Sequence, residues 1–234
     1  MGHRPRGRDE SNDDGPIAPA RRPAAQKKTV IATERDAAAR TAWQAEVAGW
    51  DAEQVVFLDE TSTHTSLTRP RGRAPRGVRV IGRVPRNHGP NVSCLAALTP
   101  TGITAPLVIA GAIDGTVFQP WLREWLLPAL RPGTTIVLDN LSVHRSPDVR
   151  KLITAAGCHL GFLPAYSPDF NPIELAFAKL KTHLRGTASR TYDTLVAAIG
   201  DGMNQISAAD ATAWYEHCGD HFPHDDTQPL CDSL

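Results

Sequence analysis

The sequence has few cysteines, few aromatic residues and no long apolar run. Its four cysteines lack the paired spacing of a disulfide framework or a standard metal site. No apolar run approaches the roughly 20 residues that are needed to cross a bilayer, and the first residues contain no apolar signal core. These absences exclude the disulfide-rich secreted and membrane-spanning classes. We therefore expect a globular protein that stays in the cytosol and has no membrane partner.

The chain also lacks net charge, because 25 basic residues balance 25 acidic ones. The average conceals a strong asymmetry, since residues 69–86 contain seven arginines and no acid, whereas residues 216–234 contain five acids and no Lys or Arg. A polyanion responds to the local distribution of charge and not to the total. The arginine segment also contains Gly and Pro, which predicts an irregular loop able to follow a phosphate backbone.

Residues 163–181 contain a clear helix start. Asn171 and Pro172 suit the cap and first position of a helix, and an apolar stripe follows at helical spacing. Its members are Ile173, Phe177, Leu180 and Leu184. A polar stripe beside it carries Glu174, Lys181 and Arg185. Two interpretations of Glu174 stay open here, a capping box with Asn171 and a functional carboxylate.

Two more acids stand where apolar runs stop. Residues 54–58 (QVVFL) predict a strand that ends at Asp59, and residues 134–138 (TTIVL) predict one that ends at Asp139. Each alone is ordinary turn chemistry. Two strand-end aspartates with a helix-start glutamate form a rarer combination. Three such carboxylates repel one another, and divalent cations between them relieve that repulsion.

Three motifs carry a family resemblance: FLDE at residues 57–60, LDN with a following His at 138–144, and YSPDFNPIE at 166–174. They resemble the DDE transposases of the insertion sequence 630 family, bacterial relatives of the mariner elements, and the similarity runs from about residue 27 to about residue 219. The resemblance implies a ribonuclease-H-like fold whose catalytic acids are Asp59, Asp139 and Glu174. These acids would hold two Mg²⁺ or Mn²⁺ ions.

The same resemblance implies DNA cleavage and strand transfer at the ends of a mobile element, into TA targets. The implied partner is double-stranded DNA, with a possible homodimer and a cytoplasmic, nucleoid-associated location in a bacterium. Candidate supporting residues near the acids are Glu60, Asn140 and His144, for which ordinary loop hydrogen bonding is an equal alternative. The candidate DNA-binding residues are Arg69, Arg71, Arg73, Arg76, Lys181 and Arg185.

Periodicity predicts the same fold class independently. Residues 54–58, 91–98 and 103–110 form an antiparallel three-strand meander, and helices then alternate with strands at 134–138 and 158–163. The expected fold is an α/β, ribonuclease-H-like mixed sheet, with this meander and parallel strands, flanked by helices.

We expect three regions along the chain. Residues 1–26 form a disordered leader with basic and acidic residues, 27–219 form the catalytic domain with a preceding linker helix, and 220–234 form an acidic tail. Family members normally carry an N-terminal helix-turn-helix region, but residues 1–26 lack its apolar periodicity. The resemblance thus implies a separately encoded helix-turn-helix partner. The alternatives are a truncated, non-transposing remnant that binds DNA or a partner transposase, and a resolvase-like nuclease.

Overall fold

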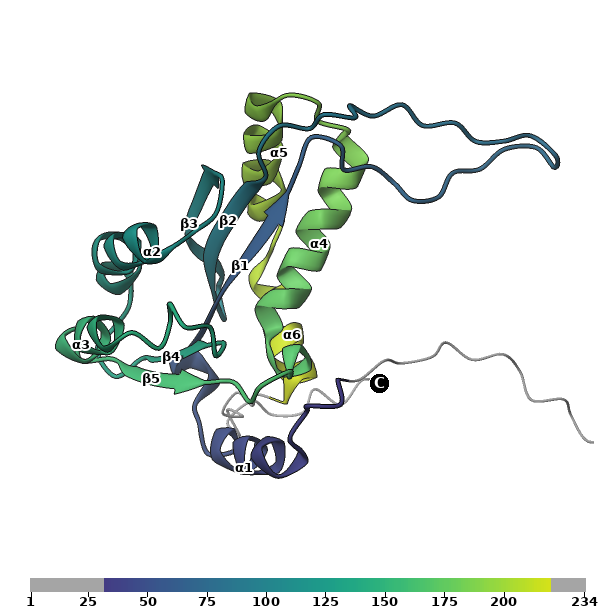
Figure 1. The fold of residues 1–234 in the computed structure, drawn as a ribbon. Helices are drawn as coiled ribbons and strands as arrows, with labels where there is room; N and C mark the ends of the chain where they lie inside the picture. Colours follow the sequence, from purple (N-terminus) through teal and green to yellow (C-terminus); the bar gives the residue numbers. More distant parts are fainter. Residues whose placement is uncertain (1–31, 220–234) are drawn as a thin grey trace, which may run out of the picture. The chain divides into compact units, whose positions relative to one another are not determined.

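The computed structural model describes residues 32–219, which build a five-stranded mixed sheet with helices on both faces (Figure 1). The strand order is β3-β2-β1-β4-β5. The strands are β1 (Val55–Thr63), β2 (Val92–Thr99), β3 (Gly102–Ala110), β4 (Thr135–Leu138) and β5 (His159–Phe162). The first three pair antiparallel, while β4 pairs parallel to β1 and β5 parallel to β4. The predicted combination of a meander with parallel strands is confirmed.

Helices connect and cover the strands. They are α1 (Ala37–Val47), α2 (Gly115–Trp121), α3 (Pro147–Ala155), α4 (Pro172–Thr187), α5 (Tyr192–Asn204) and α6 (Ala208–Cys218). A π-helical turn (Leu122–Leu126) continues α2, and short 3₁₀ turns lie at Ala52–Gln54, Leu127–Ala129 and Pro168–Phe170. Among residues 32–219, none of the helices has the length and apolarity that a membrane crossing requires.

Strand β1 divides its side chains between two apolar cores. Val55 and Phe57 pack in a core with α1, α4, α5 and α6, whereas Val56 and Leu58 pack in a second core with α2 and α3. This division follows from the alternation of side chains along a strand. The predicted apolar stripe of α4 is confirmed, because all four of its members are buried in the first core. The sheet is therefore the middle of three layers.

A long loop of residues 64–91 joins β1 to β2 and runs outward and back (Figure 1). It has no regular secondary structure, as its Gly and Pro content predicts, and residues 68–84 are all exposed. The predicted leader (1–26) and acidic tail (220–234) lie outside the described residues. The boundaries of the three regions stay predictions.

Tyr215 of α6 supplies a testable polar contact inside the first core. Its side chain is fully buried, and its hydroxyl lies 2.9 Å from the Val55 carbonyl oxygen and 2.7 Å from that of Leu98. Replacing Tyr215 with Phe removes the donor that these two carbonyls share but keeps the ring that packs on Phe57. We expect a loss of about 1–2 kcal/mol in the free energy of unfolding, measured with urea.

The exposed Tyr192 provides the matched control. Tyr192→Phe removes the same atom from the surface, where water replaces any lost contact, and should change stability by less than about 0.5 kcal/mol. Equal effects of the two substitutions would show that the buried hydroxyl contributes no more than a surface one.

Candidate active site

Three carboxylates from three different elements line one pocket. Asp59 lies within β1, Asp139 follows β4 directly, and Glu174 is the third residue of α4. Because β1 and β4 are parallel neighbours in the middle of the sheet, they run in the same direction, and α4 begins beside the end of β4 (Figure 1). The pocket has a volume of about 430 Å³. The structure thus brings together the three acids that the sequence singled out.

The prediction that the first strand ends at Asp59 is wrong. Strand β1 continues to Thr63, because β2 pairs with it as far as Thr63 opposite Val92. The parallel partner stops earlier, and its last pair with β1 joins Phe57 to Val137. Asp59 therefore lies two residues past the point where β4 leaves β1, with a neighbouring strand on one side only. The opening beside it is the pocket.

Asn171 holds the Asp59 carboxylate. Its side-chain Nδ2 donates a 2.8 Å hydrogen bond to Asp59 Oδ2, although 112 residues separate the two in sequence. Side-chain alternation explains the contact, since Asp59 lies on the same side of β1 as Phe57, which packs in the core with α4. Sequence reasoning missed this role. The only signal was the place of Asn171 directly before Pro172, which was interpreted as a helix cap.

The capping box between Asn171 and Glu174 is not formed. Asn171 does occupy the cap position of α4, but its side chain makes no capping hydrogen bond. The side chain is only 3% exposed and points its amide at Asp59 instead, and its Oδ1 has no hydrogen-bond partner. Glu174 contributes only its backbone N–H to Asn171 and keeps an exposed side chain. Its carboxylate is free to face the pocket.

The folded structure disfavours the ionised form of the Asp59 carboxylate. Burial is the main cause that raises its pKa, to about 7, and the negative charges of Glu174 and Asp139 add to the rise. The backbone N–H of Glu60 donates to Asp59 Oδ1 at 2.7 Å and opposes it. The pocket therefore contains like charges whose repulsion the protein groups only partly relieve.

His144 is a buried histidine held between two acids. Its side chain is 1% exposed, its Nδ1 lies 2.6 Å from Asp139 Oδ1, and its Nε2 lies 3.5 Å from Glu60 Oε1. Burial lowers the pKa of His144, but the bond to Asp139 and the nearby Glu60 carboxylate outweigh this and raise it to about 9. Burial also raises the pKa of Asp139, yet the His144 bond and the Leu141 N–H lower it overall. The imidazole thus fixes one oxygen of Asp139.

The other two predicted supporting residues have different partners. Glu60 faces the second core, opposite to Asp59, and reaches His144 there. Asn140 lines the pocket and donates from Nδ2 to the Leu163 carbonyl oxygen at 2.5 Å. This bond ties the loop after β4 to the loop after β5. Asn140 therefore orders the pocket wall through a loop hydrogen bond and makes no bond to the three acids.

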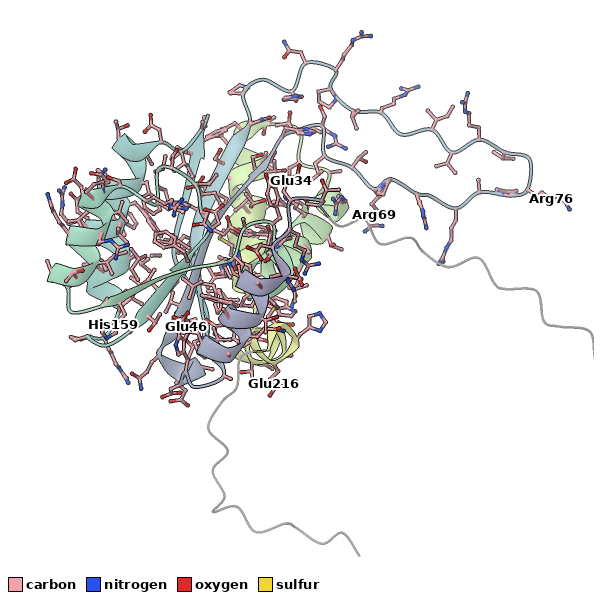
Figure 2. The ribbon with its side chains drawn as sticks, turned by 60° about the horizontal axis from the view of Figure 1, so that its bottom comes forward. Glu34, Glu46, Arg69, Arg76, His159 and Glu216 are labelled. Atoms are coloured by element: carbon pink, nitrogen blue, oxygen red, sulfur yellow. The ribbon has the colours of Figure 1, made fainter. Side chains whose placement is uncertain are left out.

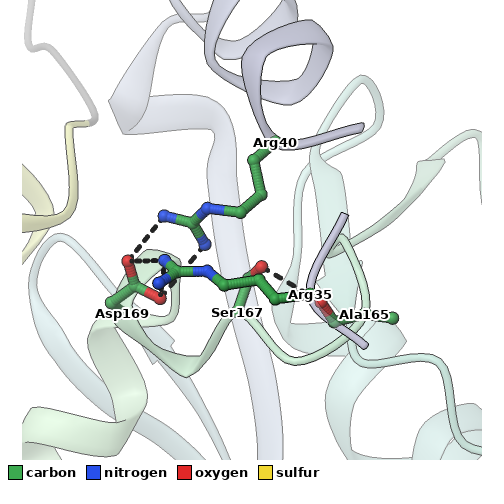
Figure 3. A network of polar contacts seen from close by, with 5 residues as sticks. All are labelled: Arg35, Arg40, Ala165, Ser167 and Asp169. Carbon is green, nitrogen blue, oxygen red and sulfur yellow. Dashed lines mark hydrogen bonds and ion pairs between the residues drawn. The ribbon is translucent and has the colours of Figure 1, made fainter. Parts of the chain in front are cut away.

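Asp169 anchors the pocket wall to the start of the described chain (Figure 3). Arg35 and Arg40 both bind it, with shortest N···O distances of 2.7 and 2.6 Å. The Arg40 guanidinium also lies 3.8 Å from the centre of the Phe170 ring. Asp169 is thus neutralised by two arginines and does not contribute to the acidic pocket. Asp169 lies within the 166–174 motif, but nothing in the sequence indicated either of its two partners.

The predicted DNA-binding arginines lie along the 64–91 loop. Figure 2 shows Arg69 near its base and Arg76 at its far end. Arg69, Arg71, Arg73 and Arg76 are all exposed, and no ion pair involves them within residues 32–219. At the base, Arg69 approaches α4 so closely that a Cβ on Gly186 would lie 3.1 Å from its Nη2. The loop therefore begins beside the C-terminal part of α4.

Lys181 and Arg185 lie on α4 in the same polar stripe as Glu174. Both are partly exposed, and Arg185 is in the last turn of the helix, next to Gly186. Residues at spacings of three and four share one helix edge. Two basic side chains therefore lie along α4 between the pocket and the base of the arginine loop.

The residues around the pocket have the chemistry of a site for a hard divalent cation. Three carboxylates and the unpartnered Asn171 Oδ1 are oxygen donors of the kind that Mg²⁺ and Mn²⁺ prefer. In the described part of the chain, however, no three His, Cys, Asp or Glu side chains are clustered tightly enough to hold an ion. The donor set fits, while the side chains are spread around the pocket.

A comparison with known families covers the region of the chain that contains this site. Residues 54–196, which contain all three acids, match the family described as DDE superfamily endonuclease. The Tc1 transposase of Caenorhabditis elegans is 32% identical over 77 residues, which is 33% of this chain and 28% of that protein. The match to this chain therefore spans less than a third of the length of this relative.

Two solved Mos1 structures share the fold. The Mos1 paired end complex with Mg has a TM-score of 0.68 at 14% identity and matches 88% of this chain and 69% of that one. The Mos1 strand transfer complex has a TM-score of 0.67 at 13% identity and matches 84% and 63%. The predicted ribonuclease-H-like sheet flanked by helices is thereby confirmed. Because the family match spans more than half of its length, the chain belongs to the DDE superfamily endonucleases.

Proposed function

We propose that this chain is the catalytic domain of a transposase of the insertion sequence 630 family, which cleaves DNA at element ends and joins those ends to TA targets. One observation carries the proposal: Asp59, Asp139 and Glu174, from three separate elements, line a single pocket. Membership of the endonuclease family supports it. The Mos1 neighbours are a paired end complex with Mg and a strand transfer complex. As part of the proposal we extend the pairing of ends and strand transfer to this chain.

In this proposal the three carboxylates hold two Mg²⁺ or Mn²⁺ ions. Such ions supply Lewis acidity to the scissile phosphate and lower the pKa of the attacking water or hydroxyl. The protein groups keep the ligands in position. Asn171 fixes Asp59 through Oδ2, His144 fixes Asp139 through Oδ1, and the start of α4 presents Glu174. Glu60 and Asn140 support this arrangement through His144 and the pocket wall.

Double-stranded DNA is the proposed substrate. It would bind along the basic side chains of α4 and of the 64–91 loop. Lys181 and Arg185 would contact phosphates next to the pocket, and the arginines of the 64–91 loop would extend the contact outward. We also propose that a helix-turn-helix partner recognises the element ends, and pairing of two ends favours a homodimer. We place the protein in the bacterial cytoplasm, at the nucleoid. A non-transposing remnant is less well supported, because the acids retain the side chains that orient them.

The first experiment tests the three acids. Glu174→Gln removes one carboxylate and preserves side-chain size, so it should reduce Mn²⁺-dependent nicking of supercoiled plasmid by roughly 100-fold or more. Glu46→Gln changes an exposed carboxylate on α1 and should leave nicking unchanged. If the Glu174 variant nicks at the rate of the unmodified protein, Glu174 is not part of the site.

Ion binding is tested separately from activity. Asp59→Asn removes a partly buried charge that the other two acids repel, so without divalent ions at pH 8 the variant should be more stable by roughly 1–3 kcal/mol. Mg²⁺ or Mn²⁺ at millimolar concentration should raise the melting temperature of the unmodified protein and of Glu46→Gln, but have little effect on Asp59→Asn. An equal rise in all three proteins would contradict the proposed ligand.

A third experiment concerns the arginine loop. Replacing Arg71, Arg73 and Arg76 with Ala should weaken binding to a random-sequence duplex. It should also flatten the plot of log K against log salt by up to about 2.7, at about 0.9 per lost phosphate contact. The matched control replaces Arg123, Arg131 and Arg150, which are also exposed but lie in the α2 and α3 region. The proposal is wrong on this point if both triple variants have the salt slope of the unmodified protein.

A further inference from the structure

Tyr166 is an exposed aromatic residue in the lining of the acidic pocket. It belongs to the loop between β5 and α4, its side chain is 59% exposed, and it lines the pocket together with the three acids. Holding a cation does not require an aromatic ring at this position, and a phosphate contact would use the tyrosine hydroxyl alone and not the face of the ring. Large exposed aromatic side chains at a binding pocket commonly serve as contact surfaces for a ligand.

The backbone of Tyr166 has an unusual conformation. Its φ is +55°, in the left-handed region, and within residues 32–219 only Ala105 and Ala188 share a positive φ among residues other than glycine. A bulky side chain rarely adopts this conformation, because its Cβ crowds the backbone. Such strain persists where the surroundings impose it and is concentrated at functional sites. The backbone conformation at Tyr166 is therefore imposed by the rest of the loop.

The loop is anchored on the C-terminal side of Tyr166. Ser167 is 4% exposed and donates from its hydroxyl to the Ala165 carbonyl oxygen at 3.2 Å. Asp169 is bound by two arginines, and the Phe170 ring is 7% exposed beneath Arg40. These contacts order the loop while the Tyr166 ring stays in solvent. The ring is thus presented on a fixed backbone.

A second apolar side chain lines the same pocket from the other loop. Leu141, after β4, is 50% exposed, and its backbone N–H donates to Asp139 Oδ1 at 3.1 Å. The pocket therefore combines carboxylates with an exposed aromatic ring and an exposed aliphatic chain. A nucleotide has the matching combination, since its phosphate suits a cation site and its base offers an apolar face.

We propose that the Tyr166 ring is a stacking platform for an unpaired base of the nucleotide beside the scissile phosphate. This inference rests on the proposed DNA cleavage. A base buried in the duplex stack cannot contact a side chain by its face, so the nucleotide must leave the stack, and stacking on an aromatic ring offsets part of that cost. The fixed backbone of Tyr166 lowers the entropy lost on binding.

The test couples a missing ring to a missing base. The protein carries Glu174→Gln to prevent cleavage, and the probes are duplexes of one sequence with a single central TA step, the proposed target, which sets the register. Each probe contains one abasic residue, at successive positions around that step. On the intact duplex, Tyr166→Ala should weaken binding about 5- to 150-fold, measured by fluorescence anisotropy. On the duplex whose abasic residue replaces the stacked base, the two proteins should bind equally.

Matched variants separate the ring from the backbone. Tyr166→Phe keeps the ring and should bind the intact duplex like the parent protein. Tyr166→Gly removes both the ring and the unfavourable φ, and should bind as weakly as Tyr166→Ala while melting at the same temperature or higher. Normal binding by the Gly variant would assign the effect to backbone strain and overturn the proposal.

Two further results would also overturn it. One is a binding defect of Tyr166→Ala that is equal on every duplex. Such a defect counts against the proposal also where sedimentation shows that the substitution disrupts a dimer. The other is no binding defect at all. The abasic scan needs no cleavage, so absence of nicking by the unmodified protein would refute the proposed function alone. If nicking occurs, the position that abolishes the difference must lie within about two nucleotides of the nick.

Discussion

The site depends on one electrostatic constraint, a carboxylate held partly buried beside two others at the middle of the sheet. Burial and like charge both oppose ionisation of Asp59. The fold opposes this with two N–H donors, one from Glu60 on the same strand and one from Asn171 at the start of α4. They relieve only part of the repulsion. A folded pocket that retains excess negative charge is suited to take up positive charge from outside the protein.

Much of the fold could be predicted from the sequence, because its apolar residues form short runs in the strands and a helical stripe in α4. The run at 54–58 and the helical stripe that begins at Ile173 each bury one side against the same core, so local pattern and tertiary packing agree. The three acids could be identified from their positions relative to these elements and from the motif that ends at Glu174. The true end of β1 could not, because pairing with β2 extends the strand through polar residues.

The contacts that complete the site escaped prediction for a different reason. Asn171 and Asp59 are 112 residues apart, and Asp169 is 134 and 129 residues from Arg35 and Arg40. No local pattern connects partners at such separations. In addition, Asn171 had a satisfactory local interpretation as a helix cap, and this concealed its tertiary role. Residues with an adequate local function are the ones whose long-range partners a single sequence conceals most effectively.

Strand β1 connects the site to both helical layers. Successive side chains on a strand point to opposite faces, so Asp59 turns toward α4, while Glu60 turns toward the layer that contains α2. There Glu60 meets His144, whose ring packs on Phe118 with a centroid distance of 4.7 Å and whose other nitrogen holds Asp139. Asp59 and Asp139 are therefore each held by a group from a different layer. Because Asn171 and His144 belong to different layers, a shift of one layer against the other would change the relative orientation of the two carboxylates, even though neither acid has been changed.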